Sequence, residues 1–194
     1  HDKLSALRSQ LALRHADGML VCALDDIAWL LNLRGQDVHC TPVFVGYVLV
    51  SVDAATLFID KAKLTPEVEQ YLANEGVGVA PYTAVTEALH RYNDYNLLLD
   101  PAEVNYTLWR AAAQQRVVRA ASPVPAMKAV KNQTEIEGFH HAMLRDGVAM
   151  VRFLKWLKPA VQAGGETELS AAEKLRALRA EQPLFRDLSF DTIA

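Results

Sequence analysis

Cysteine is scarce in this chain of 194 residues, which contains only Cys22 and Cys40. Two cysteines cannot form the disulfide framework of a small secreted domain. Cys22 lies in the apolar run 19–23 and is expected to be a small buried side chain. Cys40 lies in a polar loop, where a free thiol suits a reducing compartment. Cysteine usage therefore predicts a cytoplasmic protein.

Long apolar runs and a strong net charge are also lacking. No run approaches the roughly 20 residues that a membrane-spanning helix needs, and the N-terminal stretch is charged and amphipathic, unlike a signal peptide. The net charge is −3, which gives no strong field for nucleic acid or an anionic membrane. We therefore expect neither nucleic acid nor membrane as a partner.

The first 122 residues have the pattern of an α/β domain. Short apolar runs typical of buried strands alternate with amphipathic stretches that end at glycine or proline. The 43–59 segment predicts an antiparallel hairpin, so we expect a mixed β-sheet flanked by helices. Asp25 or Asp26 is expected to cap the helix that ends before Gly35. Thr65 and Pro66 are expected to start the helix 65–75, with proline at the favoured first position. Expected strands are 19–23, 43–52, 56–59, 77–80, 95–99 and 117–121; expected helices are 3–15, 27–33, 65–75, 82–92 and 105–115.

The pattern changes after residue 122. Residues 123–131 predict a proline-containing connection, and 132–194 a second region with helices at 132–158 and 168–181. Asn132 and Glu135 have the spacing of a capping box, and Pro159 followed by Gly164 is expected to end the first helix. Its wide apolar stripe needs a large partner surface. A strand-like stretch at 188–193 has no later strand to pair with, so we expect a truncated domain.

Asn32 to Asp37 is the best local candidate for a binding loop, because it combines an amide, a fixed cation and a carboxylate after a helix. Arg34 has the donor geometry to bind a substrate carboxylate through two hydrogen bonds. In the competing interpretation, Arg34 and Asp37 pair across the turn or help to dock the next domain. Both interpretations stay open at this point.

Two groups of possible metal ligands are weaker candidates. Asp37, His39 and Cys40 share one loop, but a structural zinc site needs four ligands, usually in two clustered pairs, and no second pair follows in the sequence. His140 and His141 are adjacent on a helix and point about 100° apart, so they cannot both face one ion. Recognised phosphate-loop, zinc-protease, serine-hydrolase and Cys-x-x-Cys motifs are absent. We therefore predict no metal ligand in this chain.

Several stretches, taken together, resemble the three-domain branch of the Xaa-Pro aminopeptidases (aminopeptidase P), which belong to the creatinase–prolidase or "pita-bread" metallopeptidases. Ala-Leu-Asp-Asp-Ile-Ala-Trp-Leu-Leu-Asn-Leu-Arg-Gly-Gln-Asp at 23–37 resembles their middle domain. Lys-Ala-Val-Lys-Asn at 128–132 is similar to their interdomain connection. The stretches 145–149, 167–174 and 185–193 resemble the opening of their catalytic domain. The similarity covers nearly the whole chain.

The resemblance implies an enzyme that removes the N-terminal residue from peptides with proline in second position. It implies two divalent metal ions, usually manganese, held by two Asp, one His and two Glu, and a homodimer. In the family all these ligands follow the segment that 187–193 resembles. The resemblance therefore implies a fragment without catalytic residues or a metal site of its own, inactive alone, with Arg34 and Asp37 near the substrate.

A different class shares the same motifs. Creatinase-like domains also occur as catalytically dead protein-binding modules, including histone-chaperone subunits, and such a parent would keep every motif quoted above. The two hypotheses differ in whether the sequence that follows supplies the two Asp, one His and two Glu. Peptidase parentage is the preferred interpretation, because the connecting motifs resemble the active branch.

Overall fold

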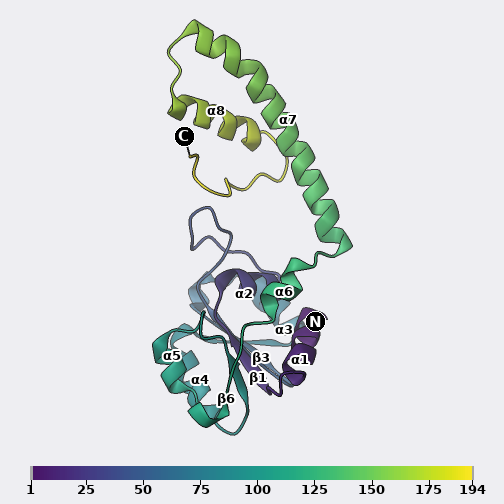
Figure 1. Ribbon diagram of the computed structural model, residues 1–194, viewed down its shortest axis with the longest axis vertical. Coiled ribbons are helices and arrows are strands. Elements are labelled where there is room, and N and C mark those ends of the chain that lie inside the picture. The colour runs from purple at the N-terminus through teal and green to yellow at the C-terminus, as the bar shows by residue number, and fades with distance from the viewer. Residues whose placement is uncertain (1, 194) are drawn as a thin grey trace. The chain divides into compact units, whose positions relative to one another are not determined.

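The computed structural model describes residues 2–193 (Figure 1). Its contacts divide the chain into two compact units, each described here by itself. The first comprises residues up to 38 together with 42–129. The second comprises 39–41 together with the residues from 130 onward. Among the described residues, no helix is both long and apolar enough to cross a membrane.

The first unit alternates strands and helices as the sequence pattern predicts. Two of the short helices, α3 and α5, begin at a side-chain cap: for α3, Thr65 accepts a hydrogen bond from the Val68 N–H, and Pro66 occupies the first helical position. Asn105 caps α5 in the same way through the Leu108 N–H. The elements are α1 Asp2–Ala12, β1 Gly18–Val21, α2 Leu24–Leu30, β2 Tyr47–Ser51, β3 Ala55–Ile59, α3 Pro66–Asn74, β4 Val77–Pro81, α4 Val85–Arg91, β5 Leu97–Leu99, α5 Tyr106–Ala111, β6 Val117–Arg119 and α6 Val124–Ala129.

Six strands form one mixed sheet in the order β4-β3-β2-β1-β5-β6. The centre is antiparallel: β1 pairs with β2, and β2 with β3. The outer pairs are parallel, with β4 beside β3, and β5 joining β1 to β6. The predicted mixed sheet with an antiparallel hairpin is confirmed.

Both faces of the sheet are covered, because successive side chains of a strand point to opposite sides. In β5, Leu98 packs into one core cluster while Leu97 and Leu99 belong to the other. The first cluster is completed from α1, α2, α3 and α6, and the second from α4 and α5, which lie together in Figure 1. The sheet thus has a hydrophobic layer on each side.

The second unit consists mainly of two packed helices, α7 Gln133–Ala163 and α8 Glu168–Ala180. The predicted capping box is confirmed: Asn132 accepts from the Glu135 N–H, and Glu135 accepts from the Asn132 N–H. Arg179 of α8 forms a two-pronged ion pair with Asp146 of α7, with Nε and Oδ1 2.6 Å apart. Charge pairing and capping therefore account for much of what holds these helices.

Three local predictions were wrong. Residues 188–193 form no strand, because none of the described residues forms a neighbouring strand to pair with them. Helix α7 continues through Pro159 to Ala163, although Pro159 has no N–H to donate; Gly164, with φ of +83°, ends it. Neither Asp25 nor Asp26 caps α2, since Ala23 occupies that position and both acids lie in the first turn.

Other predicted boundaries were too generous. Strand β2 begins at Tyr47 rather than 43, because residues 43–46 join no strand ladder, and the Val43 carbonyl instead accepts from the Asp37 N–H. Strands β5 and β6 are three residues each, and α5 ends at Ala111, four residues before the predicted end. The type of each of these elements was nevertheless predicted correctly.

Candidate functional site

The loop that follows α2 is held by close backbone contacts. Asn32 adopts the left-handed region with φ of +53°, which asparagine tolerates better than most residues. A Cβ on Gly35 would lie 2.7 Å from the Cβ of Phe44, so only glycine fits here. The N–H groups of Gly35 and Asp37 donate to the carbonyls of Pro42 and Val43. The backbone of this loop is therefore held in one conformation.

Arg34, in this loop, exposes part of its guanidinium group to solvent. Nη1 donates to the carbonyl of Ala28 at 3.1 Å and to that of Leu33 at 2.8 Å, which satisfies carbonyl groups at the end of α2. Within residues 2–193, the remaining guanidinium nitrogens have no hydrogen-bond partner. Arg34 is thus oriented by one nitrogen and keeps donors for a carboxylate or a carbonyl oxygen.

Asp37 does not pair with Arg34 but with two other residues. Its Oδ2 accepts from the Val45 N–H at 2.7 Å and from Lys63 Nζ at 2.5 Å. The hydrogen bond from Lys63, followed by that from Val45, lowers the pKa of this exposed carboxyl. The interpretation in which Arg34 and Asp37 pair across the turn is therefore wrong; whether either contacts substrate stays a prediction.

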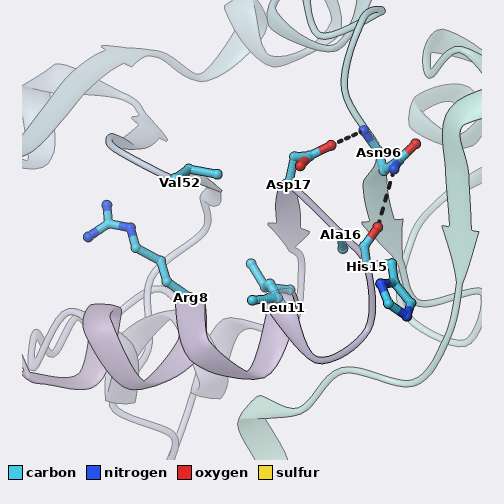
Figure 2. A pocket seen from close by; sticks show the side chains of 8 residues that line it. Arg8, Leu11, His15, Ala16, Asp17, Val52 and Asn96 are labelled. Carbon is cyan, nitrogen blue, oxygen red and sulfur yellow. Dashed lines mark hydrogen bonds between the residues drawn. The ribbon is translucent and has the colours of Figure 1, made fainter.

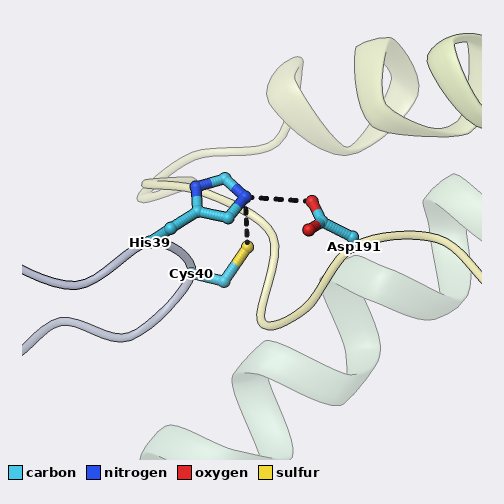
Figure 3. Close-up of side chains that lie close together, drawn as sticks. All are labelled: His39, Cys40 and Asp191. Atoms are coloured by element: carbon cyan, nitrogen blue, oxygen red, sulfur yellow. Dashed lines mark hydrogen bonds and ion pairs between the residues drawn. The ribbon is translucent and has the colours of Figure 1, made fainter.

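His39, Cys40 and Asp191 come together in the second unit (Figure 3). His39 Nε2 lies 2.9 Å from Asp191 Oδ1 and 3.3 Å from Cys40 Sγ. The hydrogen bond to Asp191 raises the pKa of His39, and partial desolvation, with the charges of Asp191 and Asp187, raises that of Cys40. Sequence analysis did not indicate Asp191, because this residue lies more than 150 positions from the loop.

The same three side chains do not form a nucleophilic triad. In such a triad the histidine contacts the nucleophile through one ring nitrogen and the acid through the other. Here Nε2 makes both contacts (Figure 3). A thiol whose pKa is raised is also a poor nucleophile at neutral pH. His140 and His141 lie exposed on α7 and take no part in this cluster.

A second charged group lies in the first unit, where α6 packs on α2. Lys128 Nζ forms ion pairs with Asp25 and with Asp26, whose Oδ1 is 2.6 Å away. The Asp26 side chain is only 2% exposed, and its Oδ2 has no hydrogen-bond partner among the described residues. Burial raises the pKa of Asp26, whereas the hydrogen bond from Lys128 lowers the pKa of Asp25. Sequence analysis missed this clamp, because it joins residues about 100 positions apart.

Glu103 extends the same acidic group. Its Oε2 is buried without a partner among the described residues. Burial, and then the charges of Asp100, Asp26 and Asp25, raise the pKa of Glu103. Burial, with Glu103 and Asp100 nearby, raises the pKa of Cys22 to about 12, so Cys22 is no thiolate at neutral pH. This group is suited to holding α6 in place rather than to nucleophilic chemistry.

A cavity of about 370 Å³ lies between α1, the β2–β3 turn and the segment before β5 (Figure 2). Three of its polar side chains, those of Arg8, Asp17 and Asn96, already form hydrogen bonds with the backbone. Arg8 donates to the carbonyls of Ser51 and Ala54, and Asp17 accepts from the Asn96 N–H. Figure 2 shows Asn96 also donating to the carbonyl of His15. The cavity therefore lacks convergent polar groups free for a ligand.

The fold defines a class before any relative is considered. A six-stranded mixed sheet covered on both faces, followed through α6 by a long capped helix, is an α/β module attached to a further helical region. The family model of the creatinase/prolidase N-terminal domain matches residues 1–135. The chain belongs to this family.

Curated relatives match the chain over its full length. It is 37% identical over 200 residues to Xaa-Pro aminopeptidase 1 of Dictyostelium discoideum. This match covers 100% of this chain and 32% of that protein. It is 35% identical over 198 residues to Xaa-Pro aminopeptidase ApepP of Drosophila melanogaster, covering 99% of this chain and 32% of the relative. The chain spans about a third of the length of these relatives.

Solved structures agree. The crystal structure of X-prolyl aminopeptidase from Caenorhabditis elegans, described as a cytosolic enzyme with a di-nuclear active site, matches with a TM-score of 0.94 and 31% identity. The match covers 99% of this chain and 32% of that one. Xaa-Pro dipeptidase from Bacillus anthracis matches with a TM-score of 0.67 and 16% identity, over 93% of this chain and 48% of the other. At that identity the second match shows the fold alone.

Proposed function

We propose that this chain is part of a metal-dependent Xaa-Pro aminopeptidase, which removes the N-terminal residue from peptides with proline in second position. The observation that carries the proposal is the full-length match to Xaa-Pro aminopeptidases, with a TM-score of 0.94 to the C. elegans enzyme. Fold similarity by itself would not carry it, because one fold hosts several functions.

Residues 1–122 act as a middle domain, 123–131 as the connection, and 132–194 as the opening of the catalytic domain. Supporting this division, the family match ends at residue 135 and the second compact unit resumes at residue 130. Helix α6 lies in the connection, where the Lys128 ion pairs fix it to α2.

The catalytic metal site belongs to the rest of the enzyme. Two divalent ions, which we propose to be manganese, supply Lewis-acid polarisation of the scissile carbonyl when bound. The di-nuclear site of the C. elegans relative supports two ions in the complete enzyme. This chain contributes no catalytic residue and no ligand to that centre. The chain alone is therefore expected to be inactive.

Arg34 and Asp37 act at the substrate entrance in this proposal. Arg34 is held by the α2 carbonyls and keeps free donors, and Lys63 with Val45 fixes Asp37. Replacing Arg34 by Ala in the complete enzyme should lower kcat/KM for longer peptides more than for short ones. Arg91→Ala, which removes an exposed arginine paired with Glu87 on α4, is the matched control. An unchanged kcat/KM for Arg34→Ala would show that the loop has only a structural role.

Peptidase parentage is tested with a peptide that begins Arg-Pro-Pro. Release of its first residue is measured, with and without manganese, for this chain and for the full product of its gene. We expect activity only in the full product, and only with metal. Manganese-dependent activity of this chain alone would contradict the non-catalytic assignment. Folded but inactive protein in both samples would favour the binding-module alternative.

The complete enzyme is further proposed to be a cytoplasmic homodimer that acts on peptides and has neither nucleic acid nor membrane as a partner. The cytosolic C. elegans relative and the two free cysteines support the location. Fractionation of cells that express the tagged full product would test the location. Sedimentation of the purified protein would test the dimer.

A further inference from the structure

We propose that His39, Cys40 and Asp191 form a binding site for one divalent transition-metal ion, with Zn²⁺ the best match. Residues 39–41 cluster with the second unit, so all three ligands belong to one compact unit. Among residues 2–193 they are the one group of at least three His, Cys, Asp or Glu side chains close enough to share an ion.

The distances are those of ligands around a common centre. The three ligand atoms lie within 4.8 Å of one another, with the histidine nitrogen 2.9 Å from the carboxylate and 3.3 Å from the sulfur. Tetrahedral zinc, with bonds of about 2.0–2.3 Å, separates its ligand atoms by about 3.3–3.6 Å. His39 and Asp191 are exposed, so the small outward movement that an ion requires meets little resistance.

Hydrogen bonding alone satisfies this arrangement poorly. When His39 Nε2 carries a proton it donates to Asp191, and its contact with Cys40 Sγ at 3.3 Å is then only a weak second hydrogen bond to sulfur; when it carries a lone pair it accepts from the Cys40 thiol and loses the bond to Asp191. Figure 3 shows both contacts converging on this one nitrogen. A metal ion would take the place of the proton between these groups and bond to His39 Nε2, Cys40 Sγ and Asp191 Oδ1 together.

The backbone also brings the two adjacent ligands together. Neighbouring side chains diverge by about 100° in a helix and alternate between faces in a strand. His39 and Cys40 instead lie in a turn, and Cys40 has φ of +58°, an uncommon value for a residue with a side chain. The turn brings Sγ to the same side as Nε2. This explains why two consecutive residues can act as ligands.

The donor set selects the metal. Thiolate and imidazole favour zinc, cobalt or nickel, whereas manganese prefers oxygen ligands. Binding needs no redox partner: the Cys40 thiol releases its proton to solvent, His39 coordinates through Nε2 as the neutral tautomer with its proton on Nδ1, and the Asp191 carboxylate coordinates as it is. Three protein ligands leave a fourth position for water.

The test uses the reduced, metal-free chain titrated with Co²⁺ and then with Zn²⁺. We expect one Co²⁺ per chain, tetrahedral cobalt absorption with a thiolate-to-cobalt charge-transfer band, and displacement of cobalt by Zn²⁺. Mn²⁺ at the same concentration should not compete. On Zn²⁺ binding, amide hydrogen exchange should slow at residues 39–41 and 188–192, which a surface-adsorbed ion would not produce.

Matched variants locate the ion. Cys40→Ser should abolish the charge-transfer band, and His39→Ala or Asp191→Asn should weaken binding by at least about tenfold, since even outer partners of ligands contribute that much. Cys22→Ala, which removes the other thiol, should leave binding unchanged. The proposal is overturned if Co²⁺ shows no 1:1 saturation, or if binding survives Cys40→Ser and Asp191→Asn unchanged, as it would at His140 or His141.

Discussion

The two compact units bury their apolar residues to very different extents. With the exception of Ala149 and Leu178, every buried apolar residue of residues 2–193 lies between Leu4 and Val124. In the second unit, large side chains of α7 remain open to solvent: Phe139 is 57% exposed, Val151 68% and Leu154 58%. The first unit therefore has a completed core, whereas the second has two helices and an uncovered apolar face.

The difference shows that helix formation and core formation are separate problems. Helix α7 forms with a capping box, a glycine end and charged pairs to α8, which are local or nearest-neighbour effects. Burial, the dominant favourable contribution to folding, needs a surface that these two helices do not provide. We infer that the second unit is part of a larger domain, as the proposed function requires.

The largest contrast is expected for matched leucine truncations. Leu57 is fully buried in β3, so Leu57→Ala should lower the free energy of unfolding by about 2–5 kcal/mol. Leu154→Ala on α7 should change it by less than about 0.5 kcal/mol, as surface substitutions do. Denaturant unfolding of both variants measures this. Equal losses would show that the apolar face of α7 is covered after all.

Loss of the α6 clamp should have a smaller effect, confined to the first unit. Lys128→Met leaves Asp26 buried without a partner, and we expect a loss of about 2–3 kcal/mol, below the ~3–5 kcal/mol of fully buried pairs because Lys128 keeps 27% of its side chain exposed. Adding Asp26→Asn to that variant should recover part of the loss. A double variant as unstable as the single one would contradict the assigned role of the buried charge.

The helix caps allow the two units to be perturbed with the same chemistry. Thr65→Ala removes the cap of α3 and should lower the stability of the first unit by about 1 kcal/mol. Asn132→Ala removes the cap of α7 and should increase amide exchange in its first turns without shifting the main unfolding transition. If both variants shifted that transition equally, the two units would unfold as one.

The smallest expected effect is a pH dependence at Glu103. Because its folded-state pKa is raised, the folded protein holds this proton more tightly than the unfolded chain does. Its contribution is therefore fully present below the ordinary value of 4.5 and is lost as pH rises through the higher folded value. Glu103→Gln should be more stable than the parent at neutral pH, with the gain vanishing below pH 4.5. A gain independent of pH would exclude this titration as its cause.

Sequence reasoning predicted what depends on local pattern. Strand alternation, the 43–59 hairpin and the capping box at Asn132 and Glu135 follow from side chains within a few positions of one another. It failed where contacts between residues far apart in the sequence determine the structure. Residues 188–193 have a strand-like composition but no partner strand, and Asp191 meets His39 through the fold alone. Lys128 lies in the stretch that resembles a connecting motif, and nothing local indicates its pairing with Asp26, about 100 positions away.

From this difference in burial we infer that the first unit folds by itself and that the second does not, and producing the two parts separately tests this inference. Residues 1–131 and 130–194 would be produced as individual chains and unfolded by denaturant while secondary structure is monitored. We predict one cooperative transition for 1–131, close to that of the whole chain, and no cooperative transition for 130–194. A cooperatively folded 130–194, or an unfolded 1–131, would contradict the account.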